Sequence, residues 1–161
     1  MTELSVELIE IALCEAYKEA LKAYKADEVP VGSVILHNNI IIAKTRNRIV
    51  EKKDPTAHAE ILAIKKAAEF LNNERLNECF LFTTLEPCTM CSGAIILSRI
   101  KSVYYLAEER KAPSLKEILK KKTYNHYPKI YYYPMTKYNS SQLLSQFFAK
   151  KRNNSISLKS L

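Results

Sequence analysis

The spacing of apolar side chains along the chain predicts helices and strands that alternate. Between Val6 and Ala26, apolar residues recur at intervals of three and four with charged residues between them, which predicts an amphipathic first helix. Two β-branched runs follow at Val29–Leu36 and Ile40–Ile42, and His37–Asn39 between them predict a tight turn. These runs indicate a hairpin, the first two strands of the sheet that the apolar face of the first helix needs.

The same alternation continues through the middle of the chain. Asp54 and Pro55 predict a helix start, as N-cap and first helical residue, and Glu86 and Pro87 predict another. Alternating helices and strands predict an α/β layered fold. The elements expected after the hairpin are a helix from Asp54 to about Phe70, a buried strand at Glu78–Leu85, a helix from Glu86 to Ile100, a short strand at Lys101–Leu106, a short helix at Leu115–Leu119, a strand at Ile130–Tyr133 and a basic C-terminal helix at about 141–152, followed by a loose tail at 153–161.

Length and composition are those of one domain. With 161 residues, 47% of them hydrophobic, the chain can bury most of its apolar side chains, and its two glycines and six prolines leave little for a flexible linker. We therefore expect residues 1–161 to form a single domain. The sequence has no secretory pattern and no apolar run of membrane-spanning length, so we expect a cytoplasmic protein without membrane contact, whose four cysteines are reduced.

The positive charge lies in the last third of the chain. The net charge is +8, but residues 111–161 hold eleven Lys or Arg and only one acidic residue, which makes that segment +10 and leaves −2 for residues 1–110. Six of the ten tyrosines lie in the same segment, so cations that can meet phosphates alternate with rings that can stack on bases. This composition fits a nucleic-acid-binding surface, and a solvated lysine-rich face is the alternative.

Two short motifs supply three zinc-type ligands and one spare carboxylate. They are His58-Ala59-Glu60 and Pro87-Cys88-Thr89-Met90-Cys91. With His58, Cys88 and Cys91 as ligands, the fourth tetrahedral position would be left to water, whose pKa such a metal lowers to about 7, and Glu60 would move its proton. Taken alone, His58 could be an exposed histidine at a helix end, and the Cys-x-x-Cys a redox pair or half of a four-cysteine structural site. The joint pattern favours a hydrolytic zinc site.

The spacing within the motifs restricts where these ligands can meet. Residues two apart on a helix point apart, so His58 and Glu60 can share a site only at the beginning of a helix. Cys88 and Cys91, three apart, lie on one face of an opening turn. We therefore expect two helix starts to converge on one metal, with the strand Glu78–Leu85 returning the chain between them and both helix dipoles favouring thiolates.

Five segments of the chain resemble bacterial tRNA-specific adenosine deaminases, members of the cytidine and deoxycytidylate deaminase superfamily. The segments are Val29–Ser33, Asn47–Arg48, Asp54–Ile61, Leu85–Ala94 and Ser98–Ile100, within a resemblance over roughly residues 5 to 152. The His-x-Glu and Pro-Cys-x-x-Cys motifs are common to the zinc nucleobase deaminases, so they indicate the superfamily. Asp-Pro-Thr ahead of the histidine motif, and Leu62 where nucleotide and guanine deaminases often carry asparagine, favour the tRNA enzymes.

The resemblance implies a fold, a cofactor and a reaction. The fold is a three-layer α/β/α cytidine-deaminase-like fold with a five-stranded mixed sheet. One Zn²⁺ per subunit would be bound by His58, Cys88 and Cys91, with Glu60 as proton donor and acceptor and Asn47 as hydrogen-bond partner of the extruded base. The implied reaction is hydrolytic deamination of the wobble adenosine of a tRNA anticodon to inosine, with release of ammonia.

The resemblance also implies partners. Family members act as homodimers that bind the anticodon stem-loop of tRNA with both subunits, and Lys150, Lys151 and Arg152, at the basic end of the last helix, are the candidate RNA contacts. The segment Ala107–Ser114 departs from the Gly-containing loop that borders the RNA in the family, and its two acidic residues would repel phosphates.

Two other functions use the same metal motifs. One is a free-base or nucleoside deaminase acting on guanine, cytosine or cytidine, which needs no basic, tyrosine-rich surface. The other is a non-catalytic, zinc-stabilised RNA-binding partner subunit. The unliganded Glu60 argues against this second alternative, because a structural zinc site is closed by a fourth protein ligand and needs no free carboxylate.

Overall fold

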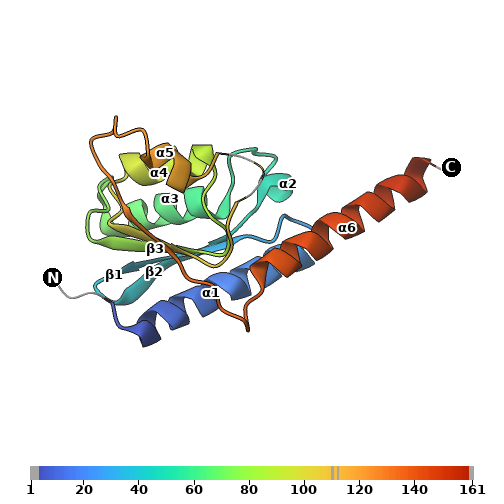
Figure 1. Cartoon of the computed structure of the whole chain (residues 1–161), viewed down its shortest axis with the longest axis horizontal. Coiled ribbons are helices and arrows are strands. Elements are labelled where there is room, and N and C mark those ends of the chain that lie inside the picture. Colours follow the sequence, from blue (N-terminus) through green and yellow to red (C-terminus); the bar gives the residue numbers. More distant parts are fainter. Residues whose placement is uncertain (1–3, 110, 112, 160–161) are drawn as a thin grey trace.

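A mixed sheet lies between two layers of helices (Figure 1). The structure, a computed structural model, describes residues 4–109, 111 and 113–159, with side chains described as far as residue 155. The strands are β1 (Gly32–His37), β2 (Ile40–Arg46), β3 (Cys79–Thr83), β4 (Ser102–Tyr105) and β5 (Lys129–Tyr132). The helices are α1 (Val6–Lys25), α2 (Ile49–Lys52), α3 (Ala59–Leu71), α4 (Thr89–Leu97), α5 (Leu115–Leu119) and α6 (Ser140–Lys159).

The described strands form one five-stranded sheet in the order β2-β1-β3-β4-β5. The hairpin partners β1 and β2 are antiparallel, β1 and β3 are antiparallel, and β3, β4 and β5 run parallel. Parallel neighbours need a crossover, and α4 supplies the one between β3 and β4. This architecture confirms the expected α/β fold with a five-stranded mixed sheet.

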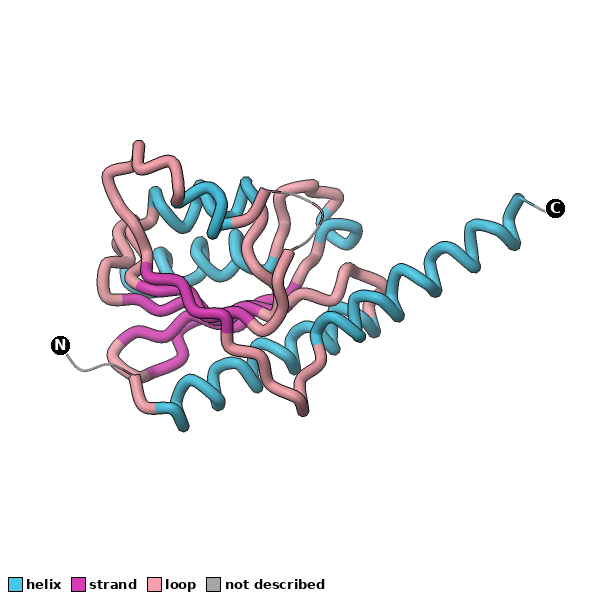
Figure 2. Tube along the Cα trace, in the orientation of Figure 1, coloured by secondary structure: helices cyan, strands magenta, loops and turns pink. Residues whose placement is uncertain are grey.

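One face of the sheet is covered by α1, with α6 beside it (Figures 1 and 2). The contact of α1 with β1 is very close, because a Cβ at Gly32 would lie 2.0 Å from the carbonyl oxygen of Ala16 and 2.6 Å from the amide nitrogen of Ala20. Only glycine fits there. On the same face Phe82, Tyr104 and Tyr131 stack across three neighbouring strands, with ring centroids 4.9 and 4.6 Å apart.

The opposite face of the sheet is covered by α3, α4 and α5 (Figure 1). Its buried core joins residues from the hairpin, from the two central strands and from these helices, among them Ile35, Ala63, Leu81, Ile95 and Leu115. Small residues on α3, such as Ala63 and Ala67, are completely buried, so this helix lies close to the sheet. The packing brings the first turns of α3 and α4 to the same side of the sheet.

Both of these helices begin later than the sequence predicted. The expected N-cap Asp54 instead accepts hydrogen bonds from the amide (2.8 Å) and the hydroxyl (2.7 Å) of Thr56 in a local turn, and α3 begins at Ala59. Likewise Glu86 and Pro87 do not open α4, which runs from Thr89 to Leu97. The prediction was wrong because an Asp side chain satisfies a turn as readily as a helix start.

The C-terminal helix is longer than expected. It was predicted at about 141–152 with a loose tail at 153–161, whereas α6 continues to Lys159, and residues 160 and 161 lie outside the described part of the chain. Figure 2 shows its last turns running beyond the rest of the molecule. No helix in the described residues is long and apolar enough to span a membrane.

Candidate active site

The three predicted metal ligands meet at two helix starts. His58 is the N-cap residue of α3, Cys88 is the N-cap residue of α4, and Cys91 lies in the first turn of α4. Their ligand atoms all lie within 4.8 Å of one another. Nδ1 of His58 is 3.5 Å from Sγ of Cys91 and 3.8 Å from Sγ of Cys88. Adjacent ligand atoms of a tetrahedral zinc site lie about 3.6 Å apart, so this group is positioned for one metal ion, and the expected convergence of helix starts is confirmed.

The side chains of His58 and Cys88 do not cap their helices and so can face this site. At α3 the amide of Ala59 instead donates to Oδ1 of Asn47 at 2.8 Å. Unpaired N–H groups at a helix N-terminus favour negative charge, so the two starts stabilise a thiolate between them.

Hydrogen bonds among the three candidate ligands shift their pKa values. Hydrogen bonds from Cys91 and His58 lower the pKa of the Cys88 thiol to about 3, against the opposing effect of burial. The hydrogen bond to Cys88, together with burial, raises the pKa of the Cys91 thiol, and the bond to Cys88 also raises the pKa of His58. A metal ion binding here would displace these shared protons, as metal binding to thiols generally does.

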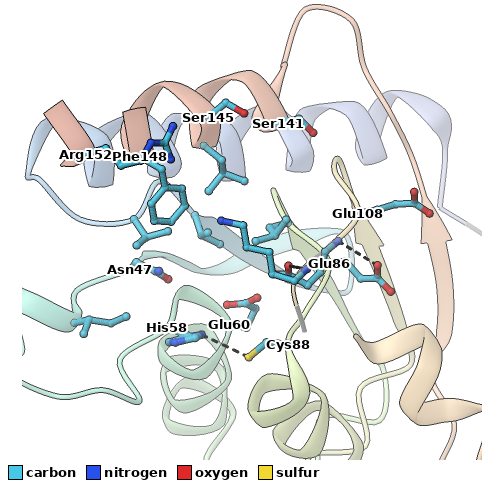
Figure 3. A pocket seen from close by; sticks show the side chains of 17 residues that line it. Asn47, His58, Glu60, Glu86, Cys88, Glu108, Ser141, Ser145, Phe148 and Arg152 are labelled. Carbon is cyan, nitrogen blue, oxygen red and sulfur yellow. Dashed lines mark hydrogen bonds between the residues drawn. The ribbon is translucent and has the colours of Figure 1, made fainter. Parts of the chain in front are cut away.

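Glu60 is the buried carboxylate beside the ligands. It lies in the first turn of α3 and is only 3% exposed, and this burial raises its pKa to about 7. Its Oε2 atom is buried and has no hydrogen-bond partner among the described residues. Figure 3 shows the carboxylate close to His58 and Cys88 and facing the pocket. A group of this kind can accept and release a proton near neutral pH.

A pocket of about 440 Å³ opens over these residues (Figure 3). Polar groups from the metal motifs and Asn47 line it below, and the charged residues Glu108, Glu109, Lys111 and Arg152 line its rim. The volume suits a single planar ring system with its immediate substituents. Its apolar walls are formed by Val29, Val31, Ile49, Leu85, Leu144 and Phe148.

Asn47 has its carbonyl oxygen already engaged. The residue is 3% exposed and lines the pocket, and its Oδ1 accepts the α3 hydrogen bond from Ala59. Its backbone amide donates to the carbonyl oxygen of Val31 at 3.0 Å. With one hydrogen bond already accepted by Oδ1, the side-chain NH₂ is the donor that Asn47 can offer to a ligand.

The three basic residues predicted as RNA contacts have different surroundings in the structure. Arg152 lines the pocket. Lys151 instead forms an ion pair with Asp27 at the end of α1 and lies over the Phe147 ring, and Lys150 lies over the ring of Tyr24. The two lysines thus help to dock α6 onto α1.

Sequence reasoning missed the part of the pocket that α6 supplies. Leu144, Phe148 and Arg152 line one wall, and Nζ of Lys111 lies 4.7 Å above the Phe148 ring. These three α6 residues are spaced four apart, so helical periodicity could have placed them on one face. It could not have shown that this face closes a pocket with the 58–60 and 86–88 segments.

The sequence and the fold are similar to those of known deaminases. The profile of the MafB19-like deaminase family matches residues 10–152. The tRNA-specific adenosine deaminase of Aquifex aeolicus (strain VF5) is 49% identical over 144 residues, which cover 88% of this chain and 94% of that protein. A solved structure from a study of A-to-I editing by tRNA:A34 deaminases at the wobble position is 40% identical, with a TM-score of 0.74 over 77% of this chain and 98% of the other.

A structure of guanine deaminase from Bacillus subtilis also matches, at 31% identity with a TM-score of 0.60 over 89% of this chain and 93% of the other. The fold is therefore common to deaminases of free bases and of tRNA, and both the identity and the TM-score are higher for the tRNA enzyme structure. By sequence and by structure, the chain belongs to the MafB19-like deaminases and, among them, to the family of tRNA-specific adenosine deaminases.

Proposed function

We propose that this protein deaminates the wobble adenosine of a tRNA anticodon to inosine and releases ammonia. The observation that carries the chemistry is the buried Oε2 of Glu60, which has no hydrogen-bond partner in the described part of the chain and lies beside the His58, Cys88 and Cys91 group. The identity of the substrate rests on the 49% identity to a tRNA-specific adenosine deaminase over nearly the whole of both chains.

Zinc is the metal we propose for the three ligands. One imidazole and two thiols form a donor set that suits Zn²⁺ and does not suit Mg²⁺ or Ca²⁺. Three protein ligands rather than four are typical of a catalytic site. When bound, the metal supplies Lewis acidity that makes water a nucleophile near neutral pH. The N–H groups at the two helix starts favour the negative charge of the thiolates.

Glu60 moves the protons of the reaction. Water adds its oxygen to C6 of the adenine ring and gives up a proton to Glu60, which passes it to ring nitrogen N1. The second proton of the water follows through Glu60 to the amino group, the C6–N bond breaks, and ammonia leaves as the C6 carbonyl of inosine forms. Burial suits Glu60 to this exchange because it raises the pKa of the carboxylate to about 7.

Asn47 and the apolar walls would orient the base. The NH₂ of Asn47 is the donor left for an acceptor atom on the purine, while its oxygen is held by Ala59. A pocket of about 440 Å³ admits a base but not a stem-loop, so the target nucleotide must be extruded from the RNA.

The RNA partner and the homodimer are part of the same proposal. Arg152 and Lys111 at the pocket rim, in a segment with a charge of +10, support binding of the anticodon stem-loop. Phe70 and Leu97, which are 67% and 81% exposed on α3 and α4, are apolar side chains that a second subunit would cover. All four cysteines are free, which fits the reducing cytoplasm.

The test is to incubate the zinc-loaded protein with unmodified tRNA and to sequence the anticodon. Conversion of adenosine to inosine at the wobble position is the expected result. Ammonia release from guanine, cytosine or cytidine, without conversion of tRNA, would support the free-base or nucleoside alternative that the Bacillus subtilis guanine deaminase match raises. Binding of tRNA without any turnover would instead support a non-catalytic subunit.

A further inference from the structure

A second buried carboxylate lies next to the ligand Cys88. Glu86 lines the pocket and is 3% exposed, and it has no ion-pair partner among the described residues. Its oxygens accept two backbone hydrogen bonds instead. Oε2 accepts from the amide of Glu109 at 3.3 Å and Oε1 from the amide of Lys116 at 3.2 Å. A single side chain therefore holds two points of the chain that are seven residues apart.

The backbone around Glu86 is joined to the same segment. The amide of Glu86 donates to the carbonyl oxygen of Ala107 at 2.8 Å, and the amide of Leu115 donates to that of Pro87 at 3.0 Å. The hydroxyl of Thr89 donates to the carbonyl oxygen of Pro113 at 2.9 Å. Residues 86–89, which carry the ligand Cys88, are thus attached to both ends of the segment 107–116.

Ahead of the β-bridge at Ser114 and the start of α5, the described residues of this segment, 107–109, 111 and 113, have no regular secondary structure, and we call them the rim segment. Glu108, Glu109 and Lys111 line the pocket from it, and Lys111 reaches the Phe148 ring on α6. Segments without helix or sheet hydrogen bonds depend on side chains to fix their course. Glu86 is the buried side chain that accepts hydrogen bonds near both ends of this one.

We propose that Glu86 is a positioning residue that holds the rim segment, residues 107–109, 111 and 113, in the conformation that binds RNA. This inference rests on the proposed function for the identity of the ligand. Glu86 acts through the amides of Glu109 and Lys116, so its loss weakens the binding of RNA, while the metal ligands and Glu60 keep their geometry.

The test is Glu86→Gln, which keeps the shape of the side chain but replaces one acceptor oxygen by a donor. The new NH₂ faces one of the two amides and cannot accept from it. We expect the Kd and KM for an anticodon stem-loop RNA to rise about tenfold, as for one lost hydrogen bond to a charged acceptor. We expect kcat to stay within about twofold, zinc content to be unchanged, and hydrogen exchange at residues 109 and 116 to accelerate.

The matched control is Glu28→Gln. Glu28 is also buried, at 2% exposure, and also accepts two backbone hydrogen bonds, from Val50 and Glu51. Its replacement removes a comparable interaction elsewhere and leaves exchange at residues 109 and 116 unchanged. If Glu86→Gln fails to fold, a comparison of Lys116→Pro with Lys116→Ala tests the same contact. Both substitutions remove the lysine side chain, but only proline also removes the amide hydrogen that Glu86 accepts. Proline is tolerated there because residue 116 lies in the first turn of α5.

Three outcomes overturn the proposal. They are unchanged exchange at residues 109 and 116, a loss of zinc, or a fall in kcat with Kd unchanged, which would place Glu86 in metal binding or in the chemistry. A failure of the proposed function is distinguishable from these, because the unsubstituted protein would then not convert the RNA. Hydrogen exchange still decides in that case whether Glu86 anchors the rim.

Discussion

In the proposed function Asn47 uses both ends of its side-chain amide, and substitution can separate the two uses. Its oxygen accepts from the amide of Ala59 at 2.8 Å and so completes the start of α3, and its nitrogen is the donor left for the base. Asn47→Ala removes both functions. Asn47→Asp keeps an acceptor for Ala59 but replaces the donor by a second acceptor.

The structure sets the size of each effect. In Asn47→Ala the buried amide of Ala59 loses its acceptor, which costs about 2 kcal/mol of unfolding free energy. For a chain of this length that lowers Tm by about 4–8 °C. In Asn47→Asp the hydrogen bond survives, and the N-terminus of α3 favours the new charge, so stability should change by less than about 1 kcal/mol. Its kcat/KM should fall about 100-fold, because an acceptor then faces an acceptor on the base.

Urea denaturation and steady-state deamination of the stem-loop RNA, both at pH 8, measure the two effects on the same proteins. The expected pattern is that Asn47→Ala loses stability and activity, whereas Asn47→Asp loses activity alone. If Asn47→Asp retains kcat/KM within about threefold of the unsubstituted protein, the amide nitrogen does not donate to the base. If Asn47→Ala is as stable as the parent, the bond to Ala59 does not support α3.

Four further predictions follow from named contacts. Glu60→Gln should keep zinc, measured by plasma mass spectrometry, and lower kcat by about 10²–10⁴; a kcat within about threefold would refute its role. Cys88→Ala should lower zinc content, and full retention would remove Cys88 from the ligand set. Gly32→Ala, whose Cβ would lie 2.0 Å from the Ala16 carbonyl oxygen, should lose about 1–3 kcal/mol in urea denaturation; an unchanged midpoint would contradict the close packing of α1. Arg152→Ala, at the pocket rim, should weaken RNA binding and reduce the slope of log binding constant against log salt concentration by about 1. The effect should be larger than that of Lys151→Ala, and equal losses would show that the position at the rim is irrelevant.

The elements that sequence predicted well are those whose pattern is repetitive. Apolar spacing placed α1 within one residue at its C-terminal end and α5 at Leu115–Leu119, where the structure has it. The strands were also found, because β-branched runs between turn residues leave few alternatives. Periodicity reports which residues face a core, and the core of this fold is formed by such residues.

Helix starts were harder to predict, because a start is defined by one residue and its immediate partners. Asp54 and Glu86 each stand before a proline and looked like N-caps, yet Asp54 closes a turn with Thr56 and Glu86 binds amides of the 109–116 region. The true N-caps are His58 and Cys88. The converging helix starts were nevertheless predicted correctly, since the argument depended on ligand spacing and not on the caps.

Contacts between residues far apart in the chain could not be predicted from the sequence. Lys150, Lys151 and Arg152 are adjacent and equally basic, so nothing local distinguishes them. Their surroundings differ because Lys151 pairs with Asp27, 124 positions away in the chain, while Arg152 lines the pocket. The same holds for Glu86, whose partners are backbone amides that carry no sequence signal of their own.

This difference between local and distant contacts also separates chemistry from substrate choice in this protein. The metal ligands and Glu60 lie within two short motifs, and a local motif can be recognised in a sequence because its members keep a fixed spacing. One wall and the rim of the pocket come from later in the chain, from α6 and from Glu108, Glu109 and Lys111, and these residues reach the motifs only through the fold. The two regions meet at Glu86, which lies in the metal-binding segment and binds the rim. We therefore expect substitutions in α6 or the rim to change RNA affinity while zinc content stays constant.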